Sequence, residues 1–259
     1  MNRTVVGRFL IACAAILGVG VLTDVGVSAS DREPTLKTPL PTAWAPNTRE
    51  TNKCRNFHGT KWKMCDGPRR TPEPYGEEAY VATDLGLGDQ RTAQHLLGQA
   101  PKPEWIDAVS GQAKPTLLWP VENGHFGRGF GYVRKQRRNK RHDGVDIGAP
   151  VGELVRAVND AIVAYSDNGV NGYGNMVMLV HKDGSMSTYC HQRSNYVFAG
   201  QQVRRGQVIG EVGVTGITRG PHLHFEWHVR GRPKDPMPRM VGRPTRHDHT
   251  PLEGAEYWL

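Results

Sequence analysis

Two histidines separated by a single residue, near the C-terminal end of the chain, are the first side chains whose spacing suggests chemistry. The stretch 214–227 reads V-T-G-I-T-R-G-P-H-L-H-F-E-W, and polar and apolar side chains alternate after its glycine–proline turn. Strict alternation is typical of a β-strand, in which every second side chain points to the same face. We therefore expect His222, His224 and Glu226 on one face, where both imidazoles can reach one metal ion or one substrate atom. Such a site needs further ligands from another part of the chain.

A second polar motif, R-H-D-G-V-D-I-G-A-P at 141–150, offers those ligands. Its glycines and proline argue against a helix, and in an extended segment His142 and Asp146 face the same side. Two histidines and one aspartate form a ligand set suited to zinc, with a fourth position left for water. Zinc in such a site polarises a carbonyl and lowers the pKa of its bound water to roughly 7. Taken alone, each motif has a simpler explanation. His142 and Asp146 could belong to a capped turn, and His222 and His224 could be two exposed histidines on a strand.

A third motif is the run S-T-Y-C-H at 187–191. In a regular strand Tyr189 and His191 share one face, so His191 is a candidate acid or base beside the metal. The alternative is an ordinary histidine at the end of a strand. Cys190 then points the other way, and we expect it to be a small buried hydrophobic residue rather than a zinc ligand.

The N-terminal residues 1–29 have the layout of a secretory signal peptide. Arg3 and Arg8 precede an apolar run at 9–22, and V-S-A at 27–29 offers small residues for cleavage. The apolar run is shorter than the ~20 residues of a membrane-spanning helix, although an uncleaved anchor is the alternative. We therefore expect an exported protein, in the periplasm, in the cell envelope or secreted. In that setting a disulfide between Cys54 and Cys65 is expected, the alternative being a metal knuckle that also uses His58.

The rest of the chain divides by pattern. Residues 30–75 are rich in proline, threonine and basic residues and predict a linker that carries the disulfide loop. Residues 76–115 show roughly helical spacing, broken at L-G-L-G, and predict two short helices that end at the prolines 101 and 103. Residues 116–236 alternate short β-rich runs with glycine turns and predict an all-β domain of antiparallel sheets. No fold is assigned to the basic, proline-rich tail at 237–259.

The segment 118–236 resembles the lysostaphin/LytM-type zinc metallopeptidases, which cleave peptide cross-links in bacterial cell walls. The resemblance covers nearly half of the chain and implies a barrel-sandwich-like core. The matching motifs run in order: W-P-V at 119–121, F-G-Y at 130–132, H-D-G-V-D-I at 142–147, N-G-Y-G-N at 171–175, T-Y-C-H at 188–191, V-R-R-G-Q-V-I-G at 203–210 and G-P-H-L-H-F-E at 220–226.

By this resemblance His142, Asp146 and His224 hold one zinc ion, and His191 and His222 are the catalytic pair. The implied activity is that of a zinc metalloendopeptidase. Zinc-bound water attacks a peptide bond of peptidoglycan stem peptides or cross-bridges, and the metal and histidines stabilise the tetrahedral intermediate.

Two further residues, Tyr189 and Glu226, are candidate partners that orient an imidazole. For Glu226 a cross-strand ion pair is the alternative. The other histidines, His228 among them, belong to no motif and are expected to be surface or core residues. The sequence leaves open whether the helices before the β-domain block its cleft or position it.

The sequence also allows functions other than that of a peptidase. A catalytically inactive wall-binding or amidase-regulating domain on the same fold is the main alternative, and the presence of all five histidine and aspartate positions argues against it. A lipoyl or biotinyl carrier module lacks its acceptor, because Lys182 has the wrong flanks. The net charge of +8 and the basic run at 134–141 favour carboxylates of stem peptides or anionic wall polymers, the alternative being a solvated loop. Export makes nucleic acid an unexpected partner.

Overall fold

The structure of the protein, a computed structural model, describes residues 53–56, 63–66, 71–133 and 140–242. These residues all belong to one unit of the chain, Trp44–Leu259. The predicted signal peptide, residues 134–139 of the basic run and residues 243–259 of the tail lie outside the described residues. Among the described helices none combines the length and the apolar character needed to cross a membrane.

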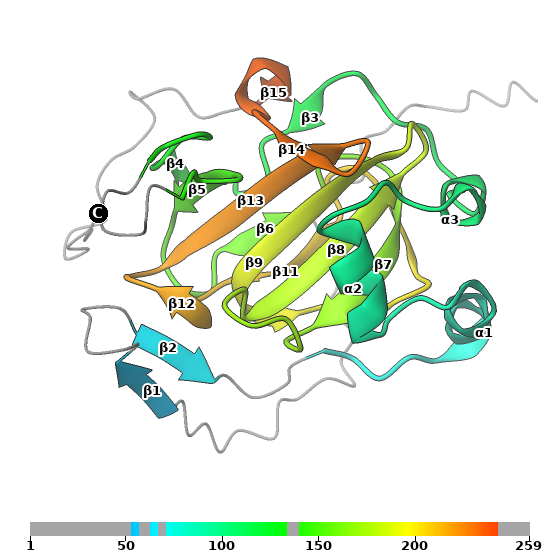
Figure 1. Cartoon of the computed structure of the whole chain (residues 1–259), viewed down its shortest axis with the longest axis horizontal. Coiled ribbons are helices and arrows are strands. Elements are labelled where there is room, and N and C mark those ends of the chain that lie inside the picture. The colour runs from blue at the N-terminus through cyan, green and yellow to red at the C-terminus, as the bar shows by residue number, and fades with distance from the viewer. Residues whose placement is uncertain (1–52, 57–62, 67–70, 134–139, 243–259) are drawn as a thin grey trace, which may run out of the picture. The chain divides into compact units, whose positions relative to one another are not determined.

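One ten-stranded sheet forms the centre of the fold (Figure 1). Its main path runs in the order β10, β7, β8, β9, β13, β5 and β4, and every neighbouring pair along this path is antiparallel. The bounds of these strands are Gln202–Val203 (β10), Ala161–Asp167 (β7), Asn175–His181 (β8), Ser185–Asn195 (β9), His222–Val229 (β13), Val145–Gly148 (β5) and His125–Phe126 (β4).

Short strands extend this sheet and flank it. β11 (Val208–Val212) pairs with β9 and with β6 (Leu154–Arg156), and β14 (Arg232–Lys234) pairs with β13. A separate three-stranded sheet contains β1 (Lys53–Asn56), β2 (Lys63–Asp66) and β12 (Gly216–Thr218). The only parallel pairing among the described strands joins β15 (Met240–Val241), which follows the 3₁₀ turn Met237–Arg239, to β3 (Leu117–Leu118).

The central strands are apolar on both sides because each face of the sheet is covered. Every residue of β8, N-M-V-M-L-V-H, is buried. Val177 and Leu179 belong to one hydrophobic cluster, together with residues of β5, β6, β11 and β13. Met176 and Met178 belong to a second cluster, together with the helical residues described next. The alternation of the strand thus places successive side chains in two different cores.

Three short helices cover the second face, namely α1 (Gly76–Leu85), α2 (Gln90–Leu96) and α3 (Pro103–Asp107). In Figure 1, α2 lies across the strands β7 and β8. The first two helices meet at L-G-L-G as predicted, with Gly86 left-handed at the end of α1 and the Asp89 side chain capping α2. Pro103 begins a third helix rather than ending the second, since a proline lacks only an N–H that the first turn does not use.

The predicted fold class is confirmed, because the domain is built mainly of antiparallel strands and preceded by a small helical segment. Two predicted segments contain more structure than expected. The linker 30–75 includes the hairpin of β1 and β2, and residues 237–241 form a turn and a strand. The hairpin register sets Cys54 opposite Cys65, which is compatible with the disulfide, although the bond itself stays a prediction. The domain boundaries also stay predictions.

One buried histidine makes the stability of this fold depend on pH. His181 at the end of β8 is 1% exposed, and its ring nitrogens are hydrogen-bonded to the carbonyl of Asp160 and the hydroxyl of Ser187. Burial lowers the pKa of His181 below its ordinary value of 6.5, although Asp160 and Asp183 oppose the shift. Below pH 6.5 the unfolded chain therefore binds a proton that the folded chain does not bind.

We expect the free energy of unfolding to fall as the pH drops below 6.5 through the contribution of His181, by at most about 1.4 kcal/mol per pH unit. The variant His181→Gln removes this contribution, so its unfolding free energy should depend less steeply on pH between 5 and 6.5. Urea unfolding at several pH values, with both proteins in the same metal state, measures the two slopes. Equal slopes would show that His181 does not titrate differently on folding.

Candidate metal centre

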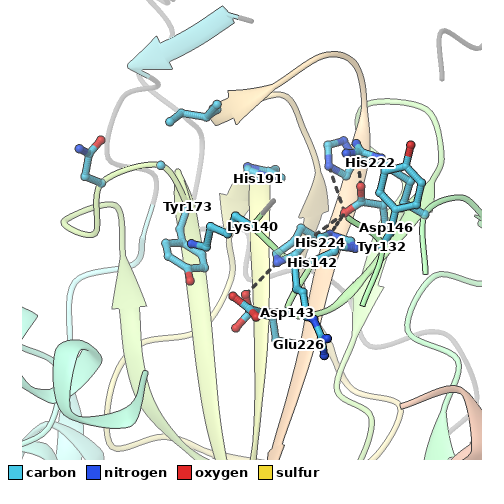
Figure 2. A pocket seen from close by; sticks show the side chains of 15 residues that line it. Tyr132, Lys140, His142, Asp143, Asp146, Tyr173, His191, His222, His224 and Glu226 are labelled. Carbon is cyan, nitrogen blue, oxygen red and sulfur yellow. Dashed lines mark hydrogen bonds and ion pairs between the residues drawn. The ribbon is translucent and has the colours of Figure 1, made fainter. Parts of the chain in front are cut away.

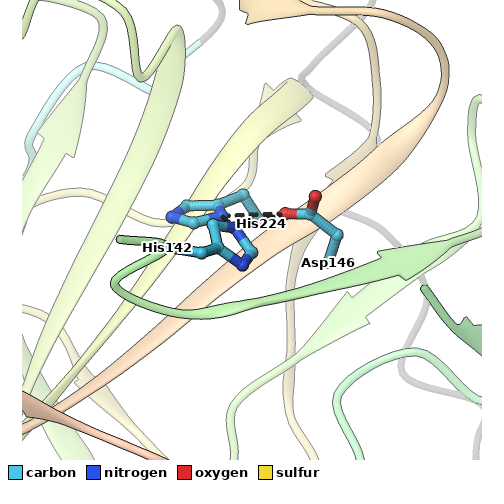
Figure 3. Close-up of side chains that lie close together, drawn as sticks. All are labelled: His142, Asp146 and His224. Carbon is cyan, nitrogen blue, oxygen red and sulfur yellow. Dashed lines mark hydrogen bonds and ion pairs between the residues drawn. The ribbon is translucent and has the colours of Figure 1, made fainter. Parts of the chain in front are cut away.

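The register of three neighbouring strands brings distant parts of the sequence together. β13 lies between β5 and β9, and His224 is directly opposite Asp146 on one side and Cys190 on the other. Directly paired residues on neighbouring strands project to the same face, with Cβ atoms about 4.5–5.5 Å apart. His142 lies in the segment that leads into β5, and its ring turns toward the same point (Figure 3).

The three predicted ligands converge. His142 Nε2 lies 3.1 Å from Asp146 Oδ1, His224 Nδ1 lies 2.9 Å from the same oxygen, and the two nitrogens are 3.1 Å apart. Four tetrahedral ligands at zinc-to-ligand distances near 2.0–2.1 Å would be roughly 3.3 Å from one another. One nitrogen from each of two imidazoles and one carboxylate oxygen therefore fit a zinc ion and leave a fourth position open.

A glycine allows His142 to approach β13. Gly144 lies between His142 and Asp146, and a Cβ atom at this position would be 2.2 Å from the carbonyl oxygen of Phe225. Any larger residue would push the segment away from β13. The glycine in H-D-G-V-D is thus required by the close approach of two backbones.

The second nitrogen of each ligand ring is held by an acceptor. His142 Nδ1 donates to the carbonyl of Gly129 at 2.9 Å, and His224 Nε2 donates to the Glu226 carboxylate at 2.9 Å. These bonds leave His142 Nε2 and His224 Nδ1, the two ring atoms beside Asp146, as the atoms that would bind a metal. Hydrogen bonds of this kind select the tautomer that can bind a metal.

The site is strongly polarised. Burial would raise the pKa of Asp146, but hydrogen bonds with His142 and His224 outweigh it and hold this pKa far below its ordinary range. Burial would lower the pKa of His224, but Asp146 and Glu226 outweigh it and raise this pKa to about 10. Arg128 Nη2 lies 2.8 Å from Asp146 Oδ2 and neutralises the oxygen that does not face the histidines. Asp146 is therefore a permanent anion that requires a cation beside it.

The two remaining predicted histidines lie next to this cluster (Figure 2). The rings of His191 and His222 are 4.9 Å apart, and the His191 ring is 5.9 Å from that of His224. His191 Nδ1 donates to the carbonyl of Thr215, and His222 Nδ1 donates to that of Gly220, both at 2.8 Å. Burial lowers the pKa of both rings. At neutral pH each is therefore uncharged, with Nε2 free to accept a proton.

His191 reaches the site through an irregular backbone. Its φ angle is +62°, and the register of β9 against β8 and against β11 shifts close to this residue. A regular strand would place His191 on the face that Tyr189 occupies. The left-handed residue instead turns the imidazole to the face of Cys190 and His224, an unusual conformation of the kind found at functional sites.

Two predictions about this strand are therefore corrected. Tyr189 and His191 do not share a face, and Tyr189 is not placed to orient an imidazole of the site. Its ring packs against Phe225 in the core, and its hydroxyl accepts hydrogen bonds from Val158 N and Ser187. Cys190 is a fully buried free thiol in the second hydrophobic cluster, as predicted, but it lies on the same side of the sheet as His224.

The histidines open into a cleft of about 280 Å³. Its walls include the cationic residues Arg128, Lys140 and Arg141, and the ring of Tyr173. Burial and the neighbouring Glu226 carboxylate raise the pKa of the Tyr173 phenol, so that it stays protonated. No residue of α1, α2 or α3 lines this cleft, so within the described residues the helices support the sheet and do not cover the site.

Sequence reasoning missed three residues of this region, namely Arg128, Tyr173 and His228. His228 Nε2 donates to the Glu226 carboxylate at 2.8 Å. Its position on the same strand, with the same parity as His224 and Glu226, is a signal that could have identified it. Arg128 gave no such signal, because a basic residue in a glycine-rich loop has many plausible partners.

Comparisons with known proteins identify relatives of part of this chain. Residues 140–236 match the profile of peptidase family M23. The chain is 43% identical over 104 residues to the DD-carboxypeptidase/endopeptidase Mpg of Neisseria meningitidis, a match that covers 40% of this chain and 23% of that protein. It is 35% identical over 122 residues to the murein hydrolase activator NlpD of Escherichia coli, covering 47% of this chain and 30% of NlpD.

A likeness to a solved structure was also found, a zinc-containing peptidase from Vibrio cholerae, with 31% identity and a TM-score of 0.45 over 48% of this chain and 40% of that chain. The chain spans between 20% and 43% of the length of the curated relatives Mpg, NlpD, DipM of Caulobacter vibrioides and an NlpD/LppB homolog of Pseudomonas aeruginosa. The residues matched by the family profile include His142, Asp146, His222 and His224. The chain therefore carries a domain of peptidase family M23 at residues 140–236.

Proposed function

We propose that this protein is a zinc-dependent endopeptidase of the cell envelope, which hydrolyses peptide bonds in the stem peptides or cross-bridges of peptidoglycan. The observation that carries the proposal is the convergence of five side chains around one cleft. Two ligand histidines and Asp146 direct their acceptor atoms at one point, and two further neutral imidazoles direct Nε2 toward the same space. The family match and the peptidase activity named for Mpg support the same reading.

His142 Nε2, His224 Nδ1 and Asp146 Oδ1 would hold the zinc ion. When bound, zinc polarises the peptide carbonyl and supplies a hydroxide near neutral pH. His191 and His222 are uncharged in the resting site, so they can accept the proton of the attacking water. The resulting imidazolium then donates a hydrogen bond to the developing oxyanion or a proton to the departing amine. The carbonyls of Thr215 and Gly220 fix both rings for these transfers.

The cationic wall is consistent with a substrate that carries carboxylates. Arg128, Lys140 and Arg141 line the cleft, and stem peptides are rich in carboxylate groups. Of the basic run at 134–141, only residues 140 and 141 are among the described ones. They support the proposed peptidoglycan substrate more directly than a separate anionic polymer.

A second candidate function is regulation of another wall hydrolase without catalysis, since NlpD of Escherichia coli is named an activator of murein hydrolases. The complete set of acceptor atoms favours the enzyme, because an inactive domain has no need for it. Incubation with purified peptidoglycan fragments, followed by mass spectrometry of the new amino termini, tests the proposal and identifies the bond that is cut. A protein that binds zinc and activates another hydrolase, yet releases no new terminus itself, would favour the second function.

Loss of a ligand should remove zinc and hydrolysis together. In His224→Ala or Asp146→Ala, two acceptor atoms remain, which is too few to hold the ion against a chelator. We expect about one zinc ion per chain in the unaltered protein and almost none in either variant, measured by atomic absorption after dialysis, with no detectable cleavage. The control is His181→Gln, which alters a buried histidine outside the site and should retain zinc. A zinc-free variant with normal turnover would refute the metal mechanism.

Loss of a catalytic histidine should separate zinc binding from turnover. His191→Ala and His222→Ala leave all three ligand atoms in place but remove a proton acceptor, and general acid–base catalysis contributes typically about 10²–10⁴-fold. We expect kcat to fall by that factor while zinc stays near one ion per chain. Steady-state hydrolysis of a defined fragment and metal analysis of the same sample measure both quantities. Near-normal kcat in either variant would contradict the role given to that histidine.

A further inference from the structure

Behind the metal ligands, a chain of hydrogen bonds runs along β13. His224 Nε2 donates to Glu226 Oε1 at 2.9 Å, and His228 Nε2 donates to the other oxygen, Glu226 Oε2, at 2.8 Å. The three residues lie at alternate positions of one strand and therefore share a face. The side chains of Glu226 and His228 are both 3% exposed, so that water does not compete for these bonds.

The direction of each hydrogen bond fixes the tautomers. A carboxylate can only accept, so both imidazoles must donate to Glu226 through Nε2. For His224 this leaves Nδ1, the atom beside Asp146 and His142, as the one that would bind the metal once the proton shared with Asp146 is displaced. For His228 it leaves the lone pair on Nδ1, which is buried and has no hydrogen-bond partner among the described residues. An unpaired buried acceptor costs less than an unpaired N–H would, so this arrangement is self-consistent.

A buried carboxylate bonded on only one side would be free to rotate. The bond from His228 occupies Oε2 and so holds Oε1 toward His224 Nε2. His228 thus acts at a distance from the metal, through Glu226, and contacts none of the three ligand atoms.

We propose that Glu226 and His228 are a pair of positioning residues, which together hold His224 in the tautomer and orientation that bind the metal. This inference rests on the proposed zinc site. His228, which belongs to no motif in the sequence, thereby has a role at the site. Glu226 is then a residue that orients an imidazole rather than a member of a cross-strand ion pair. Partners of this kind typically contribute 10- to 100-fold to metal affinity.

The test is zinc affinity, measured by competition with a chromophoric chelator on the full chain. Glu226→Gln keeps the shape of the side chain but removes its charge and offers an amide that can force the wrong tautomer on His224. We expect it to weaken zinc binding by about 10- to 100-fold. His228→Leu removes the donor to Oε2 and should weaken binding by about 10-fold, whereas His228→Gln, whose amide can donate to the carboxylate, should restore most of the affinity.

A matched control separates positioning from general stability. His181→Leu also replaces a buried strand histidine, but one that bonds Asp160 and Ser187 away from the site. We expect His181→Leu and His228→Leu both to lower the melting temperature of the chelator-treated protein, while only His228→Leu weakens zinc binding. Equal zinc affinity in Glu226→Gln, His228→Leu and the unaltered protein would overturn the inference, as would an equal loss in His181→Leu. Absence of zinc binding by the unaltered protein would instead refute the proposed function on which the inference rests.

Discussion

The antiparallel pairing of β13 with β5 sets His224 opposite Asp146, and the remaining features of the site depend on this register. A shift by one residue would turn His222, His224 and Glu226 into the core and bring Leu223 and Phe225 to the cleft. The apolar residues of β13 prevent this shift, because Leu223, Phe225 and Trp227 belong to the hydrophobic cluster on the other side. Packing of the core thereby fixes the geometry of the metal ligands, although no core residue touches them.

Charge balance is the second constraint on the site. Two carboxylates, Asp146 and Glu226, are almost completely buried, and the burial of an unpaired ion costs several kcal/mol. Each is compensated by donors on more than one side: Arg128 and two histidines surround Asp146, and two histidines bond Glu226. The site therefore combines two carboxylates that stay ionised near neutral pH with two neighbouring imidazoles, those of His191 and His222, that stay uncharged. Negative carboxylates beside uncharged imidazoles favour the binding of a divalent cation.

The sequence was sufficient to predict the ligand strand and the fold class, and it was insufficient wherever the backbone departs from a regular period. H-L-H-F-E-W alternates strictly, so its faces could be assigned, and the glycine turns between short apolar runs indicated antiparallel strands. The sequence places His191 on the wrong face, because His191 itself has a left-handed backbone conformation that breaks the alternation. The sequence S-T-Y-C-H contains no glycine or other signal that would predict this conformation. The hairpin of β1 and β2 was missed since its partner strand β12 lies far away in sequence, and pairing between distant segments leaves no local pattern. Pro103 was predicted to end the second helix, although a proline is equally suited to begin a helix, as it does in α3.

The helices α1 to α3 have a consequence for where the folding unit ends. The family match begins at residue 140, yet the apolar face of β7 and β8 is covered by Ala93, Leu96 and Trp105 from the preceding segment. A fragment cut at the family boundary would present the methionines of β8 to solvent, and bare surfaces of that kind promote aggregation. We therefore expect the smallest stable fragment of this protein to include the helices α1 to α3 as well as residues 140–236.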